Sequence, residues 1–264
     1  MLKRWISALV LFAIVFTVTW FGDPVFSILI ALVAAVAAAE FYGMRGLPRR
    51  HPLTVLGLIG VLAFIGVSHI DCSYAKPAIT AAVALPLIWL LLRPPARDSA
   101  FKLAWALTGV IYIGWMLSHF IPLRELAGGR DWVLLAVFTN IATDSAAFFV
   151  GSAWGRHRLA PRISAGKTWE GSVAGFIAAI GTAVLMVSVL PQLDSIPYWQ
   201  AVVLGALIGF FTHVGDLTES MFKRSAGVKD SGTLVPGHGG ILDRLDSILF
   251  TGVVTYYYLI FVVI

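Results

Sequence analysis

The sequence contains only one cysteine, Cys72, among its 264 residues. A single thiol excludes an intrachain disulfide, and it excludes a zinc site that needs several thiolates. Charged residues are also scarce: they make up 12% of the chain, whereas a typical soluble domain has about 25%. The sequence shows no internal repeat, no low-complexity tract and no soluble domain. The net charge of +5 does not indicate a nucleic-acid partner, and we expect none.

Apolar residues dominate instead, at 59% of the chain, with a mean hydropathy of +0.88. This composition predicts an all-α, polytopic integral membrane protein. We expect residues 1–264 to form a single transmembrane catalytic domain, with N-terminal helices over about 1–125 and catalytic helices and cytoplasmic loops over about 131–264. About nine transmembrane helices are expected, most of them near the roughly 20 residues that cross a bilayer, over 5–21, 24–42, 53–70, 76–92, 101–120, 132–152, 171–190, 198–218 and 241–263.

The first apolar stretch begins after two basic residues, like a signal peptide. It is too long for one apolar core of a signal peptide, and Gly22-Asp23-Pro24 interrupts it, so we interpret it as two retained helices. The first of these is short, and it either crosses the membrane or dips into it and returns.

The basic residues are distributed unevenly over the loops between these segments. With nine crossings, one side collects all of the 19 lysines and arginines except Lys76, Arg124 and Arg130. The positive-inside rule then places the N-terminus in the cytoplasm and the C-terminus outside. We therefore expect the charged loops to face the cytoplasm. Because no organelle-targeting stretch precedes the first helix, we expect a multi-pass protein of a bacterial cytoplasmic (inner) membrane.

The stretch 215–246, between two long apolar segments, holds the densest group of charged residues. On a helix, four of its polar side chains fall at i, i+3, i+4 and i+7 and share one face: Asp216, Glu219, Ser220 and Lys223. Asp243 and Asp246 are three apart and share a face in the same way. The turn at 236–240 contains three glycines, which let the backbone approach a ligand closely. Carboxylates for a hard cation and bases for phosphate predict a metal–nucleotide or metal–phospholipid site.

Asp144 lies inside an apolar segment, where an ionisable residue is costly and indicates function by default. Asn140, Asp144, Phe148 and Gly151 fall on one helical face, which we expect to point into the helix bundle. The alternative is a structural hydrogen bond between helices.

The loop at 155–171 contains Gly166-Lys167-Thr168, which imitates the end of a phosphate-binding P-loop. Pro161 stands where a P-loop needs glycine, and no buried strand precedes it, so we reject that interpretation. We expect Ser164, Lys167, Thr168 and Glu170 to begin a membrane helix, with Ser164 or Thr168 as its cap and Lys167 favouring phosphate. The alternatives are capping alone for Thr168 and Glu170, and a topology signal alone for Lys167.

Two longer patterns include these residues. They are Ser220-x-Phe222-Lys223-Arg224-x4-Lys229-Asp230 and Pro236-x-His238-Gly239-Gly240-x-x-Asp243-Arg244-x-Asp246. Together they resemble the signature of the phosphatidate cytidylyltransferase family, the CDP-diacylglycerol synthases, with one mild departure at Val235. The block 144–171 also resembles the family, except that Ala165 replaces the usual proline.

The resemblance implies that CTP and phosphatidate react to give CDP-diacylglycerol and pyrophosphate. It implies a Mg²⁺ ion, a second, monovalent cation such as K⁺, and a homodimer. The residues expected to act in catalysis are Asp144, Lys167, Asp216, Lys223, Lys229, His238, Asp243 and Asp246. Those expected to bind substrate are Ser164, Thr168, Ser220, Arg224, Gly239, Gly240 and Arg244. The expected metal ligands are Asp216, Asp243 and Asp246.

Two other functions remain open from the sequence. One is a related CTP-dependent lipid kinase of the polyprenol or phytol type, which would transfer the γ-phosphoryl group and release CDP. The other is a transporter whose intramembrane acid couples cations, although the charged residues crowd one side and no inverted repeat is seen.

Overall fold

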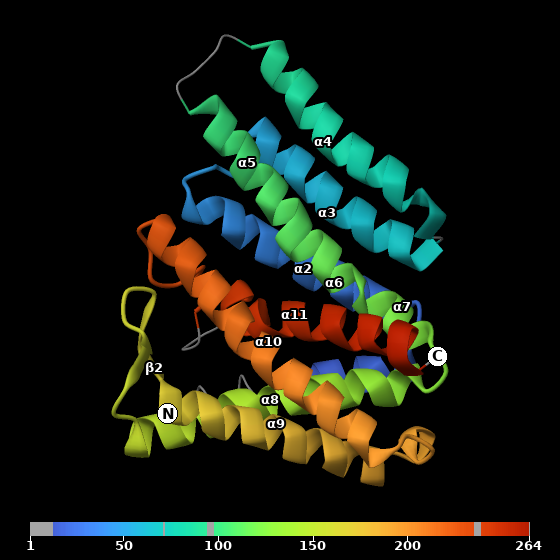
Figure 1. Ribbon diagram of the computed structural model, residues 1–264. Helices are drawn as coiled ribbons and strands as arrows, with labels where there is room; N and C mark the ends of the chain where they lie inside the picture. The colour runs from blue at the N-terminus through green and yellow to red at the C-terminus, as the bar shows by residue number, and fades with distance from the viewer. Residues whose placement is uncertain (1–12, 71, 94–97, 235–238, 264) are drawn as a thin grey trace. The chain divides into compact units, whose positions relative to one another are not determined.

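The fold is given by a computed structural model that describes residues 13–70, 72–93, 98–234 and 239–263 (Figure 1). The chain divides into two compact units. The N-terminal unit consists of Met1–Pro122 and Asp230–Asp243, and the C-terminal unit of Leu123–Lys229 and Arg244–Ile264. The prediction of one catalytic domain over the whole chain stays a prediction.

The N-terminal unit is built from apolar helices with small residues at their contacts. Its elements are α2 (Val25–Met44), α3 (Pro52–Ile70), η1 (Cys72–Tyr74), α4 (Ala75–Leu91), α5 (Ser99–Gly109), η2 (Val110–Trp115) and α6 (Met116–Ser118), and α7 (Phe120–Glu125) begins in it. The buried side chain of Tyr42 lies against Gly57 and Gly109, where an added Cβ would lie 2.4 Å from its hydroxyl oxygen and 2.4 Å from its ring, respectively. Its hydroxyl donates to the carbonyl of Ala106 at 3.1 Å. These contacts tie α2 to α3 and α5.

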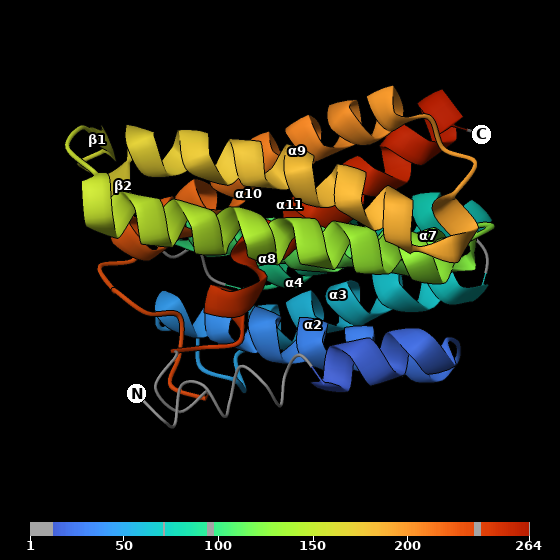
Figure 2. The same cartoon turned by 90° about the horizontal axis from the view of Figure 1, so that it is seen from below.

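The C-terminal unit contains three long helices that pack closely. Its elements are α8 (Gly129–Trp154), β1 (Arg158–Ala160), β2 (Ser164–Thr168), α9 (Trp169–Val189), η3 (Pro191–Leu193), α10 (Tyr198–Ser225), most of α11 (Leu242–Tyr258) and η4 (Leu259–Val263). Figures 1 and 2 show α8 and α9 side by side, with α10 also against α9. Glycines permit these approaches, because a Cβ at Gly205 or Gly209 would lie 2.8 Å from an alanine side chain of α9.

The predominantly helical fold of an integral membrane protein is confirmed. Seven described helices are long and apolar enough to cross a membrane: Val25–Met44, Pro52–Ile70, Ser99–Glu125, Gly129–Trp154, Trp169–Val189, Tyr198–Ser225 and Leu242–Val263. Ala75–Leu91 is a shorter apolar helix. Residues 5–12 of the first predicted segment lie outside the described residues, and residues 13–21 are helical. The total of about nine crossings and the orientation of the N-terminus stay predictions.

One local prediction was wrong. Ser164 and Lys167 do not begin a membrane helix but belong to β2, which pairs with β1 in an antiparallel hairpin, with Arg158 opposite Thr168 and Ala160 opposite Ser164. Figure 2 shows this hairpin connecting the ends of α8 and α9. Trp169 begins the helix, and the Thr168 side chain caps it by accepting from the Gly171 backbone N–H at 3.2 Å. The cap is therefore Thr168, as one alternative predicted, and not Ser164.

Candidate active site

The centre of the candidate site in the C-terminal unit is an ion pair between β2 and α10. The Lys167 Nζ lies 2.6 Å from Asp216 Oδ2, and both side chains are partly buried, at 17% and 30% exposure. The Ser220 hydroxyl, one helical turn after Asp216, donates to Asp216 Oδ1 at 3.4 Å. Asp216 and Ser220 are therefore neighbours, as their helical spacing in the sequence predicts. The hairpin places Lys167 beside Asp216.

Two further carboxylates lie near this pair. Asp144 of α8 and Asp246 of α11 each interact electrostatically with Asp216, and with each other. The approach of α11 is possible because α10 has no side chain at Gly215, where an added Cβ would lie 2.5 Å from the carbonyl oxygen of Asp246. Three acids from three helices thus meet, and Lys167 is a positive charge acting on all of them.

Asn140 of α8 connects this helix to α10 and α11 through side-chain hydrogen bonds. Its side-chain oxygen accepts from the hydroxyls of Thr212 on α10 and Thr251 on α11, each at 2.9 Å. Its amide nitrogen donates to Ser247 at 3.0 Å, and Ser247 donates to Asp144 at 3.1 Å. Asp144 therefore takes part in hydrogen bonds between helices, as the alternative for this residue predicted, and its carboxylate also belongs to the acid cluster. A role of Asp144 at a substrate or metal stays a prediction.

The prediction that Phe148 and Gly151 continue this inward face holds only for the glycine. Phe148 is 68% exposed and lies on the apolar surface. At Gly151 an added Cβ would lie 3.0 Å from the Thr168 hydroxyl, so this position faces the start of α9.

The basic residues near the end of α10, Lys223 and Arg224, have defined partners. Lys223 forms an ion pair with the buried Glu219, one turn earlier. Arg224 donates to the backbone carbonyls of Ile163 and Val228, each at 3.3 Å, and so connects the hairpin turn to the end of α10. Lys229 and Arg244 are exposed, and the charge of Arg244 acts on Asp144.

The hairpin is held at its base by an acid that had been predicted to start the helix. The Glu170 carboxylate accepts from the backbone N–H of His157 at 3.2 Å and lies 2.6 Å from its Nδ1. Ser164 is half-buried on β2. Glu170 thus fixes the exit of α8 against the entry of α9, which orients the strand that carries Lys167.

Asp243 belongs to the N-terminal unit and is held by a loop. Its Oδ2 accepts from the backbone N–H groups of Ser231 and Gly240 at 3.0 and 2.8 Å, and from the Ser231 hydroxyl at 2.9 Å. Gly239 has φ of +82°, a conformation that favours glycine. His238, predicted to contact phosphate, lies outside the described residues. That Asp216 and Asp243 share one metal ion stays a prediction.

The donor atoms of the C-terminal unit suit a hard cation. The partly exposed carboxylate of Asp216 and the carboxylate of Asp246, with Asp144 nearby, supply the oxygen ligands that Mg²⁺ prefers. Sequence reasoning missed two polar residues, Ser247 in this unit and Ser231 beside Asp243 in the N-terminal unit. Each is an ordinary serine whose partners lie far away in the sequence, so no local pattern marks it.

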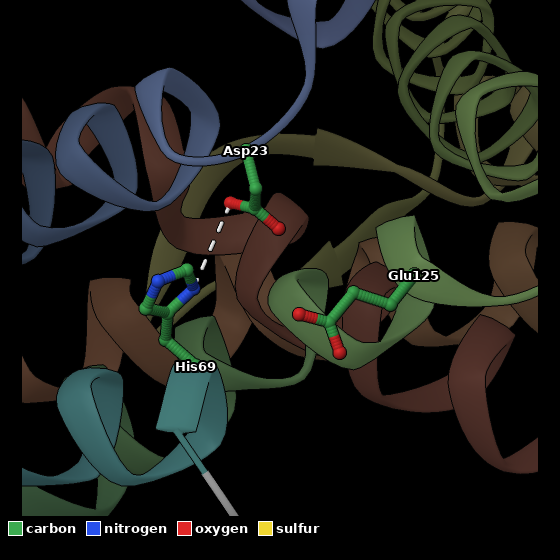
Figure 3. Close-up of side chains that lie close together, drawn as sticks. All are labelled: Asp23, His69 and Glu125. Atoms are coloured by element: carbon green, nitrogen blue, oxygen red, sulfur yellow. Dashed lines mark ion pairs between the residues drawn. The ribbon is translucent and has the colours of Figure 1, made fainter.

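Histidine and acid also meet elsewhere in the N-terminal unit, before the start of α2 and at the end of α3 (Figure 3). His69 Nδ1 lies 3.9 Å from Asp23 Oδ1. The Ser27 hydroxyl donates to Asp23 and lies 3.2 Å from His69 Nδ1. These contacts connect the start of α2 to the end of α3.

Comparison with known proteins gives a consistent result. The model of the "Cytidylyltransferase family" matches residues 2–262. A phosphatidate cytidylyltransferase of Synechocystis is 34% identical over 98% of this chain and 96% of its own length. One of Bacillus subtilis is 35% identical over 94% of each chain. The chloroplastic phosphatidate cytidylyltransferase 5 of Arabidopsis thaliana is 35% identical over 89% of this chain, which spans 66% of that longer protein.

Proposed function

The chain belongs to the cytidylyltransferase family, and we propose that it is a phosphatidate cytidylyltransferase, which transfers CMP from CTP to phosphatidate and releases pyrophosphate. The observation that carries this proposal is the similarity to phosphatidate cytidylyltransferases of Synechocystis and Bacillus subtilis over nearly the whole chain. The charged cluster at Asp216, with carboxylates and lysine together, is the kind of site that two phosphorylated substrates require.

In this reaction an oxygen of the phosphatidate phosphate attacks the α-phosphorus of CTP. The bond between the α-phosphorus and the bridging oxygen breaks, and pyrophosphate leaves with the electron pair. The attacking phosphate is already ionised, so a strong general base is unnecessary. The main barrier is the repulsion between two anions, and the residues of the site must lower it.

Asp216 and Asp246 are the carboxylates we propose as ligands of Mg²⁺, with Asp243 as a third ligand. When bound, the ion neutralises charge on the triphosphate and on the leaving pyrophosphate. K⁺ as a second cation stays a prediction from the family resemblance.

The basic residues would bind the phosphates. Lys167 is held 2.6 Å from Asp216, so its ammonium group is already placed beside the acid cluster before substrate arrives. Lys223, Lys229 and Arg244 add positive charge around the following loop, and the guanidinium of Arg244 can bind a phosphate through two hydrogen bonds. Arg224 retains donors beyond the two carbonyl contacts that fix the hairpin. His238 would orient a phosphate or a metal-bound water, and Gly239 and Gly240 would let the backbone approach it.

The membrane places the lipid substrate beside this site. Side chains on one face of α9 are apolar and exposed, including Val173, Ile177 and Leu185, as expected for a helix in contact with lipid. We propose that the acyl chains of phosphatidate enter laterally from the bilayer and that its headgroup stays at the cytoplasmic face, where CTP is available. We also propose that the protein lies in the inner membrane and that it forms a homodimer. Light scattering of the purified protein in detergent tests the dimer.

The test uses CTP labelled at either the α- or the γ-phosphorus, with phosphatidate and Mg²⁺. We expect label from α-labelled CTP in a CDP-lipid and label from γ-labelled CTP in pyrophosphate. A phosphoryl-transferring lipid kinase would give the reverse: γ-label in the lipid and α-label in free CDP. That result would replace the proposed reaction.

A further inference from the structure

Glu40 is a buried acid near the end of α2, in a helix of otherwise apolar character. Its Oε2 accepts from the hydroxyl of Ser231 at 3.2 Å and from the backbone N–H of Leu242 at 2.9 Å. An ionisable residue at such a position is costly and is retained where it has specific partners. Ser231 lies in the loop that leads into α11, and Leu242 begins that helix.

The contact with Leu242 satisfies the start of α11. Leu242 is the first residue of that helix, and first-turn N–H groups have no acceptor within their own helix. Ile241, immediately before it, has no side-chain oxygen to accept from them. Glu40 supplies this acceptor from a distant part of the chain, and its negative charge is favourable at a helix N-terminus.

The contact with Ser231 connects Glu40 to Asp243. The same Ser231 hydroxyl lies 3.2 Å from Glu40 Oε2 and 2.9 Å from Asp243 Oδ2. The backbone N–H groups of Ser231 and Gly240 also donate to Asp243. The two carboxylates therefore hold the first and last residues of the loop 231–242 together.

The loop backbone also fits directly onto the Glu40 carboxylate. A Cβ at Gly232 would lie 2.5 Å from Glu40 Oε1, and a Cβ at Gly240 would lie 2.3 Å from Glu40 Oε2. Any larger residue at either position would displace the loop or the carboxylate. The glycines of the loop therefore serve this contact as well as any approach to a ligand.

We propose that Glu40 is a positioning residue for the reaction, which holds Ser231 and the start of α11 together and so sets the orientation of Asp243. It acts through Ser231 and the start of α11 and does not touch the substrate. The inference rests on the proposed function, because Asp243 is a proposed metal ligand.

The test compares Glu40→Ala with Glu40→Gln in the full-length protein in detergent. Hydrogen exchange, measured by mass spectrometry over residues 231–243, reports the loop without any need for activity. Loss of the acceptor in Glu40→Ala should speed exchange in this segment by about tenfold. We expect kcat and kcat/KM to fall together by at least about tenfold, as for loss of an outer contact to a metal ligand. Glu40→Gln keeps an acceptor oxygen and should restore most of both.

The matched control is Tyr42→Phe, also buried on α2, which removes the hydrogen bond to Ala106. It should lower the thermal stability and leave both loop exchange and kcat at their wild-type values. If Glu40 only stabilised the helix bundle, Glu40→Ala would behave in the same way, and the inference would be wrong. Should Glu40→Ala fail to insert, Ser231→Ala removes the bridging hydroxyl and must also speed loop exchange and lower kcat; wild-type values for it would equally overturn the inference.

The exchange experiment separates this inference from the proposed function. If the wild-type protein makes no CDP-diacylglycerol but Glu40→Ala still loosens the loop and Tyr42→Phe does not, the role of Glu40 in the loop is supported while the proposed reaction is wrong. If the wild-type protein is active and Glu40→Ala retains both its exchange pattern and its kcat, the proposed function is kept and the role of Glu40 is rejected.

Discussion

The ammonium nitrogen of Lys167 lies 2.6 Å from the carboxylate of Asp216, and the two residues reach each other from a β-hairpin and a membrane helix. Both side chains are partly buried, and the positive charge of Lys167 and the negative charge of Asp216 compensate each other. Removing one partner of such a pair leaves the other charge uncompensated, which costs more than the loss of an exposed pair.

The first prediction concerns this lysine. Lys167→Gln should lower kcat/KM for CTP by at least about a hundredfold, because it removes a charge-assisted contact to phosphate from the partly buried site. Steady-state kinetics with varied CTP measures this. The matched control is Lys102→Gln, which breaks a more exposed pair with Asp98, 3.3 Å apart, and should leave kcat/KM unchanged. Equal effects of the two substitutions would contradict a role for Lys167 at the substrate.

The second prediction concerns the proposed metal ligands. Asp216→Asn and Asp243→Asn should each lower activity at least about a hundredfold, because loss of a direct ligand should cost no less than loss of an outer contact. Both variants should still insert into the membrane, since the apolar segments are unchanged. Asp194→Asn, an exposed acid on the loop between α9 and α10, is the control. Near-wild-type turnover by either purified variant would refute its assignment as a ligand.

The third prediction concerns the approach of α11 to α10. Gly215→Ala places a methyl group where the carbonyl of Asp246 and the Cα of Ser247 lie, at 2.5 and 2.8 Å. The helices must separate, so Asp246 moves away from Asp216 and activity falls by about tenfold or more. Gly181→Ala on α9 is the control, because among the described residues no other helix comes within 4 Å of its added Cβ. If both alanine variants kept full activity, the closeness of Asp216 and Asp246 would not matter to function.

The fourth prediction concerns the side of the membrane on which the hairpin lies. In a Cys72→Ser background, we introduce single cysteines at Arg162 in the hairpin turn and at Ser195 between α9 and α10, both exposed. A membrane-impermeant maleimide should label position 195 in intact cells and position 162 only after permeabilisation. Labelling of position 162 in intact cells would show that the hairpin lies outside the cell, which contradicts the proposed topology.

The sequence alone predicted the helical membrane fold and most of the residues in the charged cluster. Helical spacing was sufficient for Asp216 with Ser220 and for Glu219 with Lys223, because partners one turn apart are determined locally. The β-hairpin at 158–168 was missed because its strands are short and show no regular alternation of apolar and polar residues.

Contacts between segments that are far apart in the sequence could not be predicted either. The spacing of Asp243 and Asp246 indicates only that they share a helical face, and it does not show which of them lies near Asp216. The structure places Asp246 there because Gly215 permits a close approach. Glu40 was missed because its partner Leu242 is 202 residues away, and nothing in the local pattern of α2 indicates such a contact.

The central claim is that carboxylates from α10 and α11 hold one divalent ion. The most direct measurement is the binding of Mn²⁺, as a paramagnetic substitute for Mg²⁺, to the purified protein in detergent, followed by electron paramagnetic resonance. We predict tight binding to the wild-type protein and binding weakened at least about tenfold in both Asp216→Asn and Asp246→Asn, with Asp194→Asn unchanged. The same affinity in the wild-type protein and in all three variants would contradict the claim.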